Sequence, residues 1–361
     1  MWRNNNLISL FIGSFYRLPC PININYFWNF RSTVGIFLIV QILTRLFLTI
    51  HYSNDTAVAF SSISHITRDV NYGWEIRYLH VNGASFFLGL IYLHVRRGLY
   101  YKRYHNFHAW SIRVVLLIVS MLTAFLGYVL PWGQISYWGA TVITNLVSAV
   151  PYYRSSIVIW LWRRFSVDNA TLQRFYTLHF LFPFVLIFLS LLHLVFIHNV
   201  GSGNSLRGFR DTIKIDFWPY FRVKDILRFY IVFLLYLRLT YFATDILREP
   251  DNFILANSLV TPVHIIPEWY FLYAYAILRC IPNKVRGVLG LVLSILVLLV
   301  IPLSKEKFRR TLIYRGVFFM WVLNFFILTW LGRCPVKEIY VYLAQIGSII
   351  YFRLLILILI L

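Results

Sequence analysis

Two stretches of equal length decide how this chain folds: residues 80–94, HVNGASFFLGLIYLH, and residues 179–193, HFLFPFVLIFLSLLH. Each begins and ends with a histidine, and apolar residues dominate the interval. Over 14 residues an α-helix rises about 21 Å and returns to nearly the same face. Because polar groups inside a membrane normally face the bundle interior, two such helices side by side predict two layers of paired histidines. Paired histidines from facing helices suit haem iron.

The rest of the sequence has the composition of a membrane protein. Of its 361 residues, 60% are hydrophobic and 13% are charged, whereas soluble domains average about 45–50% and about 25%. Since roughly 20 apolar residues cross a bilayer, we expect an all-α membrane protein with eight transmembrane helices, the first four forming a haem-binding bundle. The predicted spans are 32–50, 76–99, 111–130, 172–199, 227–245, 287–303, 316–332 and 342–360.

The spans divide the chain into two predicted modules. Residues 1–210 form the four-helix haem-binding bundle, and residues 211–361 form a four-helix C-terminal module. Two long connections, about 131–170 and 246–286, interrupt the spans, and connections of this length are usually functional or lie on the membrane surface. Residues 5–15 fit an amphipathic surface helix better than a secretory signal.

Charge and cysteine content exclude several other classes. The formal charge is +21, but many arginines interrupt apolar stretches instead of lining a polar face, so we expect anionic lipid and no nucleic acid as the partner. Cys20, Cys280 and Cys334 are far apart and indicate neither a disulfide framework nor a metal site.

The histidines have other possible roles. A single intramembrane histidine is more often a packing residue or a proton relay, but the repeated interval favours ligation. Zinc would need ligands that converge on one centre, which layers about 21 Å apart cannot provide. Arg77 precedes His80 by three residues and Arg97 follows His94 by three. Either arginine alone could be snorkelling to the interface, but their symmetry favours binding of haem propionates.

A second group of residues lies in the later connection. The segment Pro267-Glu268-Trp269-Tyr270 places one carboxylate among aromatic residues. An apolar pocket can raise the pKa of a glutamate until it serves as a proton acceptor near neutral pH.

These residues, taken together, closely resemble mitochondrial cytochrome b, the haem-bearing core subunit of the ubiquinol–cytochrome c reductase (cytochrome bc1) complex. The resemblance extends nearly end to end. A single chain with both the haem helices and the later loop looks like the bc1 type, since the chloroplast relative divides them between two chains. The stretches that carry it are HITRDVNYGW at 65–74, GYVLPWGQ at 127–134, WGATVITN at 138–145, FSVD at 165–168 and PEWYF at 267–271.

The resemblance implies a role for each matching residue. His80 and His179 would ligate a low-potential haem b, and His94 and His193 a high-potential one. Glu268 would accept a proton from ubiquinol. The quinol-oxidising pocket would be lined by Phe125, Tyr128, Gly139, Ile143, Pro267, Glu268 and Tyr275, and the quinone-reducing pocket by His198, Ser202, Lys224 and Asp225. The implied partners are the Rieske iron–sulfur protein, cytochrome c1 and a second copy of the complex, in the mitochondrial inner membrane.

The sequence departs from this family at positions that usually hold glycine. The family spaces glycines 14 residues apart on its first and third spans, where this chain has Arg31, Arg45, Arg113 and Gly127. We hypothesise that ten arginines are glycines in the protein, specified by codons that some mitochondria read as glycine; the alternative is a lineage with real, compensated arginines. The formal charge would fall by ten, from +21 to +11. The ten are Arg31, Arg45, Arg96, Arg113, Arg154, Arg163, Arg164, Arg248, Arg286 and Arg333.

The leading function is a redox subunit that sends one quinol electron to an iron–sulfur protein and the other across the membrane to a second quinone. A passive haem electron carrier is the first alternative, and it predicts no role for Glu268. A proton-coupled transporter with histidine relays is the second, and it predicts no b-type haem.

Overall fold

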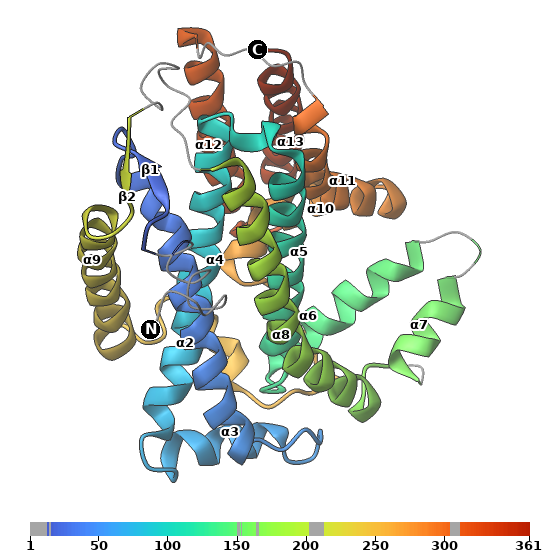
Figure 1. Ribbon diagram of the computed structural model, residues 1–361. Helices are drawn as coiled ribbons and strands as arrows, with labels where there is room; N and C mark the ends of the chain where they lie inside the picture. Colours follow the sequence, from blue (N-terminus) through green and yellow to red (C-terminus); the bar gives the residue numbers. More distant parts are fainter. Residues whose placement is uncertain are drawn as a thin grey trace.

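Helices make up most of the structure, which is a computed structural model (Figure 1). It describes residue 13 and residues 16–149, 152, 154–163, 166–201, 213–303 and 311–361. The surface helix predicted over residues 5–15 therefore lies almost wholly outside the described residues. The α-helices are α2 (Phe30–His51), α3 (Ala59–Arg68), α4 (Gly73–Tyr100), α5 (Phe107–Val129), α6 (Gln134–Asn145), α7 (Arg154–Trp162), α8 (Asn169–Val200), α9 (Tyr220–Phe242), α10 (Leu272–Cys280), α11 (Lys284–Leu296), α12 (Leu312–Arg333) and α13 (Glu338–Ile360).

Each of the eight predicted spans lies mainly on a helix, and the all-α membrane fold is confirmed. In the described part of the chain, the spans that are long and apolar enough to cross a membrane are Tyr26–His51, Phe107–Val129, Asn169–Asn199, Leu312–Arg333 and Glu338–Ile360. Helices α4 and α9 do not meet that standard, and both carry several charged residues. The span predicted over 287–303 is interrupted: α11 ends at Leu296, and two short 3₁₀ turns follow. Pro302 lies in the second of these turns.

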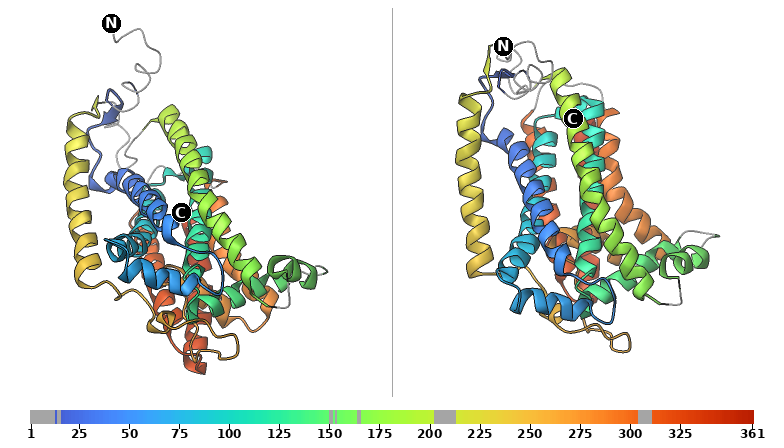
Figure 2. Two further views of the ribbon diagram at one scale, coloured as in Figure 1. Left: turned by 90° about the horizontal axis from the view of Figure 1, so that it is seen from below. Right: turned by 60° about the horizontal axis from the view of Figure 1, so that its bottom comes forward.

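The histidine-bearing helices lie in two packed pairs. Helix α2 packs along α4, and α5 packs along α8, whereas the contact between α4 and α5 is much smaller. Figures 1 and 2 show these four helices running side by side through the centre of the molecule. The bundle therefore has an interior between the α2–α4 pair and the α5–α8 pair, bordered by the histidines of α4 and α8.

The remaining helices enclose this bundle on two sides. Helix α9 packs against α4 and α2 at one edge, and α10, α12 and α13 form a second packed group. The largest buried cluster joins that group to α4 and α5, and it includes Tyr92, Trp110, Tyr273, Trp321 and Tyr351. The boundary predicted between residues 210 and 211 lies outside the described residues.

Several helix ends follow from local sequence. Asn106 accepts a hydrogen bond from the backbone N–H of Ala109 at the start of α5, and Thr311 accepts one from Tyr314 at the start of α12. Such capping satisfies an N–H that has no partner within the helix. Two short strands, β1 (Pro19–Pro21) and β2 (Lys214–Asp216), pair antiparallel and connect the N-terminal segment to the residues before α9.

The two long connections contain structure that the sequence did not predict. The first holds α6 and α7, which project away from the bundle in Figure 1, and the second holds the 3₁₀ turn Trp269–Phe271 followed by α10. The connections also meet each other: the backbone N–H of Gln134 donates to the carbonyl of Ile254 at 2.8 Å. Residues far apart in sequence are thereby brought to one end of the bundle.

Candidate functional site

The four histidines pair across the bundle interior as the sequence predicts. The ring centres of His80 and His179 lie 6.2 Å apart with planes at 89°, and those of His94 and His193 lie 6.4 Å apart at 80°. Each pair joins α4 to α8. The layers therefore form between helices, each taking one histidine from either side.

These separations fit a metal held between two imidazoles. Two imidazole–metal bonds of about 2.0–2.1 Å, plus about 1.1 Å from each nitrogen to its ring centre, give roughly 6.3 Å between ring centres. Directly stacked or hydrogen-bonded imidazoles would place their ring centres at other separations. Both pairs thus have a spacing that fits a haem iron held between one histidine of α4 and one of α8.

Hydrogen bonds fix the protonation of the first pair. The Thr44 hydroxyl donates to the carbonyl of Val40 at 2.7 Å, so it accepts from Nδ1–H of His80 at 2.8 Å. Nδ1 of His179 lies 2.9 Å from the carbonyl of Thr123, which can only accept. In both rings Nδ1 carries the proton, and the lone pair of Nε2 is left for a metal. Such outer hydrogen bonds orient metal-ligating histidines.

The second pair has buried ring nitrogens that lack such partners. Among the described residues, Nδ1 of His94 and Nε2 of His193 are enclosed and form no hydrogen bond. A buried polar atom without a partner costs free energy. Binding of Nε2 of His193 to a haem iron would remove this cost, so the pair His94 and His193 also fits a haem.

A glycine keeps one ring in place. Gly127 on α5 lies directly against His179, and a Cβ at this position would overlap the imidazole. Gly127 is the one family glycine that this chain retains among the four spaced positions. Its role is therefore steric, since only a residue without a side chain allows α5 this close to His179.

Arginines occupy the other three of those positions. Arg45 lies in the cavity of His80 and His179, where it donates to the carbonyl of Phe180 and stacks on the rings of Phe180 and Phe184. Arg31 and Arg113 line the cavity of His94 and His193. The Arg45 and Arg113 side chains are buried, and each has two guanidinium nitrogens without a hydrogen-bond partner in the described part of the chain.

The other suspect arginines lie in varied surroundings. Arg163 has φ +62°, the left-handed conformation that favours glycine just after a helix such as α7. Arg96 is buried above the Phe325 ring, Arg248 pairs with Asp245 at 3.2 Å, and Arg333 pairs with Glu249 at 3.1 Å. Arg286 lies in the first turn of α11, the side chain of Arg154 is not described, and Arg164 lies outside the described residues.

The two arginines predicted to bind propionates lie at different places. Arg77 lines the cavity of His80 and His179 and donates to the Thr67 hydroxyl at 2.7 Å. Arg97 is buried with its guanidinium 4.3 Å from the centre of the Trp28 ring, and it does not line the cavity of His94 and His193.

The residues predicted to bind quinol all line one cavity. This cavity has an almost wholly apolar wall. The wall also contains residues that the sequence did not identify, among them Met121 on α5 and Leu291 and Ile295 on α11. Those three are ordinary apolar helix residues without a distinguishing pattern. The predicted residues on the wall are Phe125, Tyr128, Gly139, Ile143, Pro267, Glu268 and Tyr275.

Glu268 and Tyr128 line two cavities at once, the apolar one and that of His80 and His179. The pKa of the Glu268 carboxyl is raised from 4.5 to about 7, chiefly by burial; the charge of Arg248 opposes this shift, and the charge of Glu249 adds to it. A carboxyl of this pKa exchanges protons readily at neutral pH. It lies where a proton can leave the apolar cavity for the neighbouring one.

The predicted quinone-reducing residues are only partly brought together. His198 and Asp225 line the cavity of His94 and His193, and Asp225 is buried with Oδ2 unpartnered in the described structure. Lys224 points elsewhere, donating to the carbonyl of Ile24 at 3.3 Å, and Ser202 lies outside the described residues. The same cavity also contains Ser32 and Arg222, which the sequence reading missed.

Fold and site define a class: a membrane-spanning helical bundle with two layers of paired histidines. Comparison with known proteins identifies the family. Residues 15–201 match the family model cytochrome b/b6/petB, and residues 255–352 match cytochrome b(C-terminal)/b6/petD. The chain belongs to the cytochrome b/b6 family, and the family assignment made from the sequence is confirmed. Haem b is accordingly its cofactor class.

The fold also matches a solved respiratory assembly. A chain of the structure titled "Hyperthermophilic respiratory Complex III" is 27% identical, with a TM-score of 0.91. The match covers 99% of this chain and 97% of the other.

Proposed function

We propose that this chain is the haem-bearing subunit of a respiratory ubiquinol–cytochrome c oxidoreductase in the mitochondrial inner membrane. Its partners would be the Rieske iron–sulfur protein and cytochrome c1, within a homodimeric complex. Two observations support this assembly: the similarity to a Complex III chain over nearly the full length, and matches to both cytochrome b family models in a single chain.

The observation that carries the proposal is the position of Glu268. An apolar cavity suits a quinol ring and its isoprenoid tail, and Glu268 is the carboxyl in its wall. Oxidation of a quinol releases two electrons and two protons, and a carboxyl with a pKa near 7 accepts a proton at working pH. Because Glu268 also faces the second cavity, it can pass that proton away from the quinol.

The histidine layers would hold two haem b groups, one between His80 and His179 and the other between His94 and His193. When bound, these groups supply one-electron carriers that link the two ends of the bundle. The residues of the chain orient the ligands: Thr44 and the Thr123 carbonyl hold the first pair, and Gly127 leaves room for His179. Arg77, in the first cavity, would bind a propionate, whereas Arg97 would have to turn from Trp28 toward the second cavity to do the same.

At the other end, His198 and Asp225 would bind a quinone and supply protons for its reduction, with Ser202 and Lys224 as further candidates. Asp225 suits the role because its Oδ2 is buried without a partner in the described residues. Proton release beside Glu268 and proton uptake beside Asp225 occur in separate cavities, so turnover would contribute to a proton gradient.

The test is quinol-dependent reduction of cytochrome c by the purified complex. We expect activity that Glu268→Gln largely abolishes while b-type haem absorbance stays unchanged. Full activity in the variant would favour a passive haem carrier over the proposal. Absence of b-type absorbance from the unaltered complex would favour a proton-coupled transporter.

A further inference from the structure

Helix α4 presents a second functional face, roughly opposite its histidines. Ser85, Gly89 and Tyr92 follow the spacing i, i+4, i+7, which places them on one side of the helix. At about 100° per residue, this side lies roughly 170° from that of His80 and His94. The face contacts the turn that follows Glu268 in the chain.

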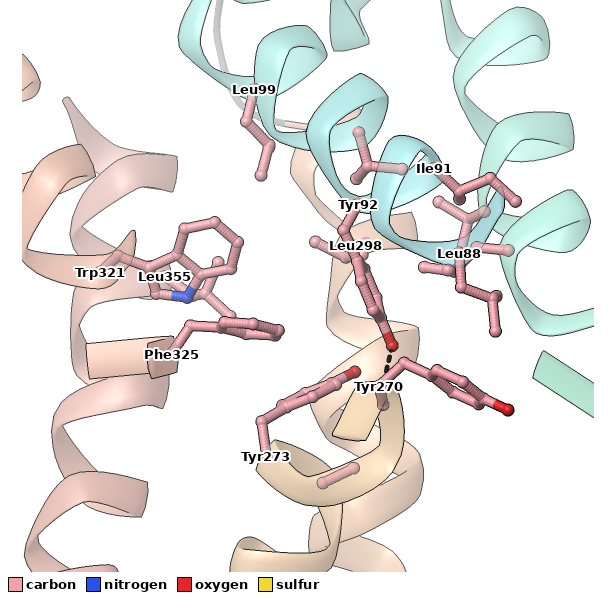
Figure 3. Close-up of a cluster of buried hydrophobic side chains, with 14 of the residues drawn as sticks. Leu88, Ile91, Tyr92, Leu99, Tyr270, Tyr273, Leu298, Trp321, Phe325 and Leu355 are labelled. Carbon is pink, nitrogen blue, oxygen red and sulfur yellow. Dashed lines mark hydrogen bonds between the residues drawn. The ribbon is translucent and has the colours of Figure 1, made fainter. Parts of the chain in front are cut away.

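Three contacts join this face to the turn Trp269–Phe271. The Tyr92 hydroxyl donates to the carbonyl of Tyr270 at 2.6 Å, as Figure 3 shows. The Trp269 indole N–H donates to the Ser85 hydroxyl at 3.2 Å. The Trp269 ring also lies against Gly89, close enough that a Cβ there would touch it at 3.5 Å.

Packing fixes the Tyr92 ring in place. Its centre lies 6.1 Å from that of Tyr273 and 5.6 Å from that of Phe325, both in edge-to-face geometry. These rings come from α10 and α12, and Figure 3 shows them gathered around the tyrosine. Tyr92 is buried, and the Tyr270 carbonyl satisfies its hydroxyl.

The anchored turn is the one that holds Glu268. The backbone N–H of Phe271 donates to the carbonyl of Glu268 at 2.9 Å, so the glutamate is part of the turn. The Tyr92 hydroxyl also lies 3.9 Å from Sδ of Met121, a residue in the wall of the apolar cavity. Tyr92 thus contacts the turn that holds Glu268 and also Met121 in the wall of the apolar cavity, which Glu268 lines as well.

We propose that Tyr92, assisted by Ser85, is a positioning residue for quinol oxidation, holding Glu268 at the junction of the two cavities. The inference rests on the proposed function, because it assigns a role within the same site. Neither residue lines the apolar cavity, so neither touches the quinol, although Ser85 also lines the cavity of His80 and His179. They act through the turn.

The experiment compares Tyr92→Phe with Tyr351→Phe in the purified complex. Tyr351 belongs to the same buried cluster, and its hydroxyl also donates to a carbonyl, that of Ser294 at 3.1 Å, but it does not contact the turn. Rates are expressed per b-type haem, so incomplete assembly does not count as lost activity. The unaltered complex is measured first, and failure to oxidise quinol would overturn the proposed function itself.

Loss of one buried hydrogen bond from Tyr92→Phe should lower kcat for quinol oxidation about threefold to tenfold. The acid limb of the pH profile should also move to lower pH, since a displaced Glu268 gains water and its pKa falls. Ser85→Ala should likewise lower kcat and move the acid limb to lower pH. The kcat of Tyr351→Phe should stay within about twofold of that of the unaltered complex. The inference would be overturned if Tyr92→Phe had the same kcat and pH profile as Tyr351→Phe, whether both variants kept the activity of the unaltered complex or both lost it equally.

Discussion

The pH dependence of quinol oxidation follows from the surroundings of Glu268. Its pKa is raised to about 7, and proton acceptance requires the ionised form. The rate should therefore rise with pH, with about one tenth of the carboxyl ionised at pH 6 and about half at pH 7. Glu268→Gln removes the acceptor, and general bases contribute about 10²–10⁴-fold. We expect the rate of the variant to fall at least about 100-fold. The rise in rate near pH 7, the acid limb of the pH–rate profile, should disappear as well.

Two charged neighbours of Glu268 shift its pKa in opposite directions, so their variants serve as matched controls. Glu249 raises the pKa of Glu268, so Glu249→Gln should move the limb to lower pH while leaving the plateau rate intact. Arg248 lowers that pKa, so Arg248→Leu should move the limb to higher pH. If residue 248 is glycine in the protein, the limb of the unaltered complex should already lie above pH 7.

The assay is the initial rate of cytochrome c reduction by quinol, measured from pH 5.5 to 9, roughly the range over which such a group titrates. Haem absorbance of each variant provides the control for assembly. A Gln variant that keeps both the rate and the acid limb would refute the role of Glu268. A limb that does not respond to either neighbouring charge would refute its assignment to this carboxyl.

Three further predictions concern other parts of the site. Gly127→Leu should displace His179 and remove about half of the b-type absorbance, one haem of two, whereas Gly316→Ala, which has open space around it, should leave the spectrum unchanged. Asp225→Asn should slow reoxidation of the reduced haems by added quinone at least about tenfold, and an unchanged rate would exclude Asp225 as the proton donor. Tryptic peptides spanning Ser32 to Tyr52 should remain uncut, with the mass of glycine at residue 45; cleavage after residue 45 would contradict the glycine hypothesis.

The arginines at the histidine layers are the main conflict between this sequence and its fold. An arginine at the centre of a membrane helix costs about 2.5–3.5 kcal/mol even on permissive scales. Arg45 offsets part of this through a carbonyl and two aromatic rings, but two of its nitrogens are unpartnered in the described structure. Arg163 adds an independent indication, because its left-handed backbone is one that glycine adopts without strain.

Periodicity in the sequence predicted the helices and the histidine pairs because both depend on local spacing. The 14-residue interval places His80 and His94 on one face whatever lies beyond the helix. Likewise the Pro267–Tyr270 segment can be recognised as a motif before its position is known. The seven quinol residues were predicted from resemblance, and their meeting in one cavity depends on the way α5, α6 and the later connection pack.

Other features depend on tertiary contacts that no local pattern reveals. Thr44 resembles any helix threonine until α4 places His80 beside its hydroxyl. Tyr92 resembles a core aromatic until the turn after Glu268 places a carbonyl against it. Lys224 shows the reverse, since sequence adjacency to Asp225 did not bring its ammonium group into the same cavity.

Haem stoichiometry tests whether the two layers of paired histidines each hold one haem. Haem b would be extracted from the purified complex and quantified against this polypeptide. We expect two haems per chain, falling to one when a histidine of either layer is replaced by alanine. One haem in the unaltered chain, or two remaining after His193→Ala, would contradict this expectation.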